Sequence, residues 1–188
     1  MARWAELEAG LRAQLQGERL AHTYRVRETA VALSNFHGAD PDQAAVAGLM
    51  HDYARSLPGA QLLDHARRRH LITDPSEEAQ PVLLHGPVAA AQLAEQGLVT
   101  DPGVLDAIRW HTTGRAGMSL LEKIVWLADY TEPGRQFPGV DAVRDLARRN
   151  LDQALLLALD QSIRFVLDRG WLLHPATVNA RNSLLLQP

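Results

Sequence analysis

The sequence predicts an all-α fold in a single domain. Nearly every segment has apolar residues at the 3.6-residue spacing of an amphipathic helix, and none shows sustained alternation with a period of two. Helix-start signals recur, in which Asp or Ser stands just before a proline or three residues before a capping glutamate. The chain has 188 residues, 46% of them hydrophobic, which is enough for one sizeable core.

The first two helices are expected near the N-terminus. One covers residues 1–16, and we interpret residues 1–17 as a helical extension to the main domain over residues 18–188. Gly17 separates this helix from a second one over residues 18–37. A 4-3-4-3 spacing places five of its residues on one face, namely His22, Val26, Thr29, Leu33 and Phe36. The histidine of this set is therefore expected to point inward.

The middle of the chain contains the next helices. Asp40-Pro41 is an N-cap followed by proline, and the helix after it carries the small residues Ala44, Ala47 and Gly48 on the same face as His51. These small residues predict the close approach of another helix. Pro58 begins a helix that reaches about residue 69, and residues 73–81 are expected to be a connection.

The second half begins with helices that start near residue 85 and after residue 102. In the latter, His111 shares a face with Val104 and Ile108. Ser119 and Glu122 form a capping box, and the helix that follows has Asp129 on its apolar face. Residues 132–139 are expected to be a loop, a long helix follows from about residue 151, and Pro175 begins the last helix.

The composition excludes several classes of protein. Without cysteine there are no disulfides, thiolate metal ligands or cysteine nucleophiles. A net charge of -3 argues against a general nucleic-acid binder. No apolar run approaches the roughly 18 residues that would span a bilayer. The first residues have charges of both signs and do not resemble a secretory signal. We therefore expect a cytoplasmic protein that binds neither nucleic acid nor membrane.

Four histidines and two aspartates form the candidate site. They are His22, the doublet His51-Asp52, His85, His111 and Asp129. Imidazole nitrogen and carboxylate oxygen together suit iron, manganese or zinc. A single histidine on an apolar face is more often a hydrogen-bonded core residue, but five of these six positions are supported by helical faces or by the doublet, and the set as a whole favours a metal site. An ionised aspartate on an apolar face is costly unless a cation pairs with it.

Two metal ions fit this residue set better than one. Six protein ligands and a bridging hydroxide are too many for a single tetrahedral ion. Shared between two divalent ions, they leave positions for water and substrate. The two ions also outweigh the charge of the two aspartates, which favours an anionic phosphate substrate.

The segments between these residues resemble one family. The chain reads LLHGPVAA at 83–90, IRWHTTGRAGMSLLEKIVWLADYTEPGR at 108–135, FPGV at 137–140 and HPATVNARN at 174–182. These runs are similar to the bacterial symmetrical diadenosine tetraphosphate hydrolases of the HD metal-dependent phosphohydrolase superfamily. The resemblance extends from about residue 18 to residue 182. It implies an all-helical HD domain that binds iron, with manganese or zinc as alternatives, and that cleaves Ap4A between its second and third phosphates to give two ADP.

The resemblance also implies roles for the six residues. His22, His51, Asp52 and Asp129 match the first metal site of the family, whereas His85 and His111 can hold a second ion or contact the phosphate. We expect Asp52, His85 and His111 to be the catalytic residues. The expected reaction is attack of a metal-activated hydroxide on a central phosphate.

Substrate contacts are expected in the loops that follow two of these residues. The stretch directly after His111 and Thr112 consists of Thr113, Gly114 and Arg115. Arg115 and Arg135 can clamp phosphate oxygens through paired N–H donors, and Phe137 can stack on a base. The expected partner is a small dinucleoside polyphosphate, and a homodimer is one option for the oligomeric state.

Two alternatives remain open at this level. The ligand set is shared with other HD hydrolases, such as nucleotidases and hydrolases of dNTPs or (p)ppGpp. A non-catalytic regulator that keeps the metal and binds a nucleotide is the alternative from a different class.

Overall fold

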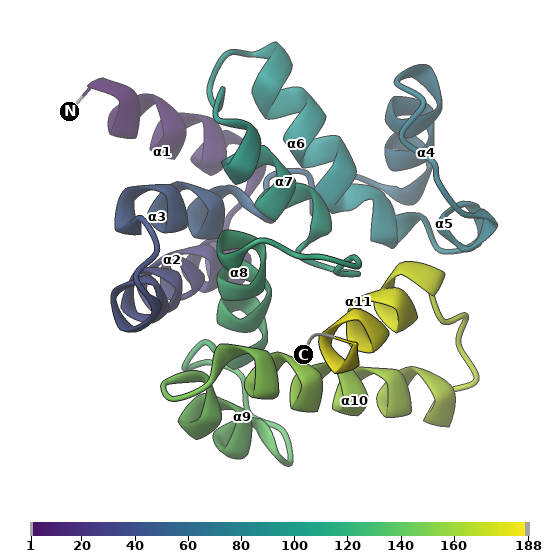
Figure 1. The fold of residues 1–188 in the computed structure, drawn as a ribbon. Helices are drawn as coiled ribbons and strands as arrows, with labels where there is room; N and C mark the ends of the chain where they lie inside the picture. Colours follow the sequence, from purple (N-terminus) through teal and green to yellow (C-terminus); the bar gives the residue numbers. More distant parts are fainter. Residues whose placement is uncertain (1, 187–188) are drawn as a thin grey trace.

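The computed structural model describes residues 2–186, and within them the chain is helical without strands, which confirms the all-α prediction. Figure 1 shows the arrangement. The α-helices are α1 (Ala2–Gln14), α2 (Gly17–His37), α3 (Pro41–Met50), α4 (Gly59–Arg68), α5 (Pro75–Ala79), α6 (His85–Glu95), α7 (Pro102–Trp110), α8 (Leu120–Thr131), α9 (Val140–Ala147), α10 (Leu151–Asp168) and α11 (Pro175–Leu185), and a 3-10 turn, η1, covers Pro81–Leu84.

Helix α8 lies near the middle of the molecule (Figure 1) and packs against α2, α3, α7, α9 and α10. Its residues Ile124, Val125 and Leu127 are fully buried, because neighbouring helices cover more than one face. Among the described helices, α2 and α3 pack against each other most extensively. A Cβ atom at Gly48 would lie 3.0 Å from Cα of Arg27, so the predicted close approach at the small residues is confirmed.

Local signals place most helix boundaries correctly. The Asp40 side chain accepts hydrogen bonds from two amides at the start of α3, and Ser119 and Glu122 form the predicted capping box of α8. The N-cap of α11 is His174, whose ring accepts a hydrogen bond from the amide of Ala176. These caps satisfy amides that have no partner within the helix.

Two predictions about the elements are wrong, and one helix has no counterpart among the predicted elements. Phe36 is 61% exposed rather than inward, since the described helices leave its side of the last turn of α2 uncovered, although Ser34 in the same turn is buried. The expected connection over 73–81 contains α5, begun by a capping box between Asp74 and Glu77, and then η1. Helix α9 follows the loop at 132–139 and was not predicted, because eight residues give too short a pattern.

Helix α1 contributes to the main core. Leu7 and Leu11 of α1, and Leu15 directly after it, are buried in the same cluster as Val26 and Ala30 of α2. The division into an extension over 1–17 and a domain over 18–188 therefore stays a prediction. None of the described helices combines the length and the hydropathy needed to cross a membrane.

Candidate metal centre

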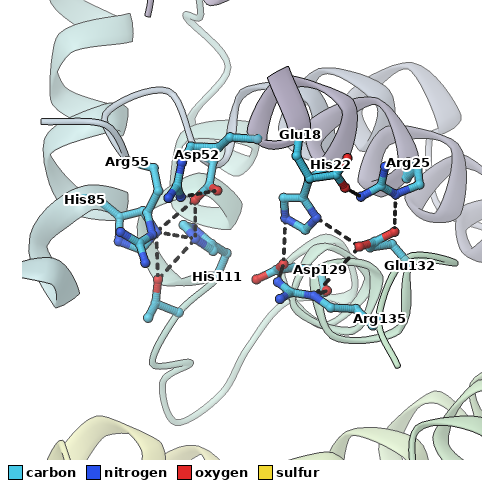
Figure 2. Close-up of a pocket in the computed structure, with 12 residues that line it drawn as sticks. Glu18, His22, Arg25, Asp52, Arg55, His85, His111, Asp129, Glu132 and Arg135 are labelled. Carbon is cyan, nitrogen blue, oxygen red and sulfur yellow. Dashed lines mark hydrogen bonds and ion pairs between the residues drawn. The ribbon is translucent and has the colours of Figure 1, made fainter. Parts of the chain in front are cut away.

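The six candidate residues meet because helix ends converge on one point. His22 lies in α2 and Asp129 in α8, whereas His51-Asp52 and His111 lie directly after α3 and α7, and His85 is the first residue of α6. Figure 2 shows two groups, one around Asp52 and one around Asp129. Five of the six line one pocket of about 480 Å³, and His51 is completely buried beside it.

The first group surrounds Asp129. Its Oδ1 lies 3.1 Å from Nε2 of His22 and 4.0 Å from Nε2 of His51. One ligand atom from each of these three residues falls within 4.8 Å of the other two, as in a set that can hold one ion.

The second group surrounds Asp52. Its Oδ1 lies 3.1 Å from Nε2 of His85 and 3.8 Å from Nε2 of both His51 and His111. The ligand atoms of His51, Asp52 and His111 again lie within 4.8 Å of one another. His51 thus lies beside both groups, but its single Nε2 lone pair can bind only one ion, whereas each carboxylate has two oxygens that can serve neighbouring ions.

Backbone carbonyls fix the tautomers of three imidazoles. Nδ1 of His51, His85 and His111 lies 2.8, 2.5 and 2.7 Å from the carbonyl oxygen three residues earlier. A carbonyl only accepts, so each Nδ1 carries the proton and each Nε2 presents a lone pair to the pocket. Nδ1 of His22 lies 3.1 Å from the Glu132 carboxylate, which orients the fourth ring in the same way.

These lone pairs fit a cation. Nε2 of His51 is buried without a hydrogen-bond partner among the described residues. Nε2 of His85 and Nε2 of His111 face each other at 2.9 Å. Two lone pairs at this distance repel unless a proton or a cation lies close to both. Because nitrogen and oxygen donors surround the same point, the residues fit a transition-metal ion.

The protonation states suit ligands too. Burial and the neighbouring His85 and His51 rings lower the pKa of His111 to about 3, so the ring is neutral at pH 7. Burial by itself would raise the pKa of Asp52, but the surrounding histidines outweigh it and hold that carboxyl below its usual range. Asp129 is likewise held ionised, chiefly by the hydrogen bond with His22 and by the nearby His51 ring against the effect of burial.

Arginines form the cationic wall of the pocket. Arg19 lies 3.9 Å from Asp52, and Arg135 donates to both the carboxylate and the carbonyl of Asp129. Arg55 lines the same pocket, and burial lowers the pKa of its guanidinium. Within residues 2–186 its side chain has no hydrogen bond or ion pair. A desolvated cation without a protein partner is costly, so Arg55 is available to an anionic ligand.

Several pocket residues were not predicted from the sequence. Thr112 places its hydroxyl 3.1 Å from Nε2 of His111, and Glu132 joins His22 to Arg25. Arg55, three residues after Asp52, carried the clearest signal, because a residue at that distance returns to the same side of a helical turn.

The structure does not bring three predicted substrate contacts to this pocket. Arg115 forms paired hydrogen bonds of 2.6 and 3.0 Å with Glu122 at the start of α8. Gly114 has a positive φ of 66°, and a Cβ there would lie 3.1 Å from Cβ of Ala180 in α11. Thr113 is buried and donates to the carbonyl of Gly114. Nearness to His111 in sequence therefore did not determine nearness to the pocket.

Comparison with known proteins gives the class. The HD domain family model matches residues 19–134. The chain belongs to the HD domain family. It is 39% identical to the symmetrical bis(5'-nucleosyl)-tetraphosphatase of Bacillus subtilis over 184 residues, which is 96% of both chains. It is 41% identical to the protein of the same name from Halalkalibacterium halodurans, over 92% of each chain.

A solved structure agrees with this assignment. The crystal structure of a predicted HD superfamily hydrolase from Clostridium acetobutylicum, described as involved in NAD metabolism, matches with a TM-score of 0.93 and 39% identity. The match covers 97% of this chain and 96% of that one. The predicted resemblance and the HD fold are thus confirmed.

Proposed function

We propose that this protein hydrolyses diadenosine tetraphosphate symmetrically to two ADP, using divalent metal ions. The observation that carries the proposal is the convergence of histidine Nε2 lone pairs with two ionised carboxylates beside an unpaired arginine. The names of the similar proteins supply the substrate. The cationic wall supports it, since a tetraphosphate is strongly anionic.

Six residues would hold the metal. His22, His51, Asp52 and Asp129 would bind one ion, and His85 and His111 would bind a second ion together with Asp52. Iron, manganese and zinc all accept nitrogen and oxygen ligands, and we propose iron. A divalent ion at this site supplies Lewis acidity towards water and phosphoryl oxygens.

The arginines of the chain would bind and orient the polyphosphate. Arg55 and Arg19 lie on the Asp52 side of the pocket, and Arg135 lies on the Asp129 side. Contacts from both sides restrict the phosphates to one path across the centre, which lowers the entropic cost of reaching the reactive arrangement. The hydrolysis forms one bond between a water oxygen and a central phosphorus and breaks the bridging P–O bond, so both nucleotides leave as ADP.

A product assay tests the proposal. The protein, purified without chelator, is incubated with Ap4A and Fe²⁺ under anaerobic conditions, with Mn²⁺ in parallel, and the nucleotides are separated by ion exchange. We expect ADP as the sole product, and no product after EDTA treatment or with Asp52→Ala. AMP with ATP would contradict symmetrical cleavage. No turnover of Ap4A with either metal would contradict the proposed substrate.

A further inference from the structure

We propose that a second pocket, between α8, the loop at 135–138 and α10, binds one nucleoside of the substrate. This inference rests on the proposed function. The pocket has a volume of about 530 Å³, within the size range of small-molecule sites. The lining residues that matter here are Tyr130, Arg135, Phe137, Gln161, Ser162 and Phe165. We call it the α10 pocket.

The α10 pocket adjoins the metal pocket. Asp129 and Arg135 line both of them, so the Arg135 guanidinium lies where the two meet. A nucleotide whose phosphates lie at the metal centre therefore has a direct path for its nucleoside past Arg135. This position beside the metal pocket favours a nucleotide over an apolar segment of another protein, which would leave the charged groups at the shared border unpaired.

The walls of the α10 pocket are aromatic and exposed. Phe137 is 36% and Phe165 is 49% exposed, although large aromatic side chains usually bury more of their surface. Both rings are held in place. Phe137 packs edge-on against Tyr130 with centroids 5.0 Å apart, and the Arg169 guanidinium lies 3.8 Å from the centroid of Phe165. Fixed, exposed rings are suited to stacking against a nucleobase.

Polar groups complement the rings. Gln161 accepts a hydrogen bond of 2.8 Å from the Tyr130 hydroxyl, which orients its carboxamide. Ser162 adds a hydroxyl to the same lining. A base and a ribose present both apolar faces and hydrogen-bonding edges, whereas the lining of the metal pocket is dominated by charged side chains and by histidines that face the candidate metal site. The two pockets together thus match the two chemical parts of a nucleotide.

Direct binding measurements test this subsite. ADP and pyrophosphate are titrated separately into the Mn²⁺-loaded full chain by calorimetry. We expect tighter binding of ADP than of pyrophosphate. Phe165→Ala is expected to weaken ADP binding about tenfold, the loss typical of one base–aromatic stack, without changing pyrophosphate binding. Phe165→Tyr keeps the ring and should keep the affinity.

Leu167→Ala is the matched control. Leu167 lies on the same helix and is 58% exposed, but it does not line the α10 pocket. This variant should bind both ligands as the wild type does. Unfolding midpoints of all variants are measured in parallel, and Phe165→Ala should fold normally because its side chain is half exposed.

Three results would overturn the subsite. They are equal affinity of the wild type for ADP and pyrophosphate, an ADP affinity that Phe165→Ala leaves unchanged, and an equal loss for both ligands. Loss of self-association in Phe165→Ala without a change in ADP affinity would assign the pocket to a second copy of the chain instead. Ap4A turnover is followed on the same samples. If turnover is absent but ADP binding still depends on Phe165, the proposed substrate fails and the nucleoside subsite stands.

Discussion

Gly86 lies in the first turn of α6, directly after His85 and close to His111. Its replacement by alanine should lower both the stability and the activity of the protein. A Cβ atom there would lie 2.8 Å from the carbonyl oxygen of Arg109, 2.9 Å from that of Ile108 and 3.2 Å from Cε1 of His111. Two of these neighbours are backbone atoms of α7, so they cannot rotate away. Helix α6 must retreat from α7 by about 0.5 Å to restore ordinary contacts.

The magnitude follows from two opposing effects. Overpacking a tight core costs about 1–3 kcal/mol, whereas alanine in place of glycine favours a helix by about 0.5–1 kcal/mol. We therefore expect Gly86→Ala to lower the free energy of unfolding by about 1–2 kcal/mol. The same shift separates His85 from His111, whose Nε2 atoms are 2.9 Å apart. Since a displacement of about 1 Å can cost a factor of about 100, we expect kcat to fall about tenfold.

Urea unfolding and Ap4A turnover of Gly86→Ala measure the two effects. Gly59→Ala is the matched control, because Gly59 begins α4 and its added Cβ would meet Pro81 at an ordinary 3.4 Å. It should be neutral or slightly stabilising. If Gly86→Ala behaves like Gly59→Ala in both assays, the close contact between α6 and α7 does not determine the distance between His85 and His111, and the reasoning is wrong.

The remaining predictions concern charged side chains. Burial would raise the pKa of Glu77. The His174 ring, 3.5 Å away, and hydrogen bonds from the amides of Thr73 and Asp74 outweigh burial and hold the pKa below its usual 4.5, so the ionised form stabilises the fold. At pH 7 the free energy of unfolding of the wild type should exceed that of Glu77→Gln by about 1–2 kcal/mol. This difference should persist above about pH 4.5 and disappear as the pH falls through the lowered pKa of Glu77. Urea titrations at several pH values measure it. Arg115→Ala leaves the buried Glu122 unpaired and should lower stability by about 1–2 kcal/mol while KM stays unchanged. Arg55→Met should raise KM for Ap4A about tenfold without lowering the unfolding midpoint, because the guanidinium lines the metal pocket and has no hydrogen bond or ion pair with the described part of the chain.

Different outcomes contradict each of these. A pH-independent difference between wild type and Glu77→Gln would exclude the carboxylate charge as the cause. A raised KM in Arg115→Ala with normal stability would restore the role in phosphate binding that the sequence suggested for Arg115. A destabilised Arg55→Met with an unchanged KM would make Arg55 a structural residue.

The helical framework could be read from the sequence because its signals are local. The Asp40 cap and the capping box at Ser119 each involve residues two or three positions apart. Helical periodicity alone predicted that His22 and Asp129 point inward, and their side chains meet in the structure. Phe36 fits the same periodicity and is nevertheless exposed, since periodicity gives direction around a helix but not whether another helix covers that face.

The sequence by itself determined the helical class, the HD family and the six residues that converge, because spacing along a helix and a specific doublet are local properties. Only the tertiary structure decided which other side chains reach the centre. It paired Arg115 with Glu122, left Arg55 in the metal pocket without a partner among residues 2–186, and placed Phe165 and Phe137 in the lining of one pocket. These outcomes depend on how α8, α10 and the turn after α3 pack, and such packing joins residues far apart in the chain through contacts that no local pattern encodes.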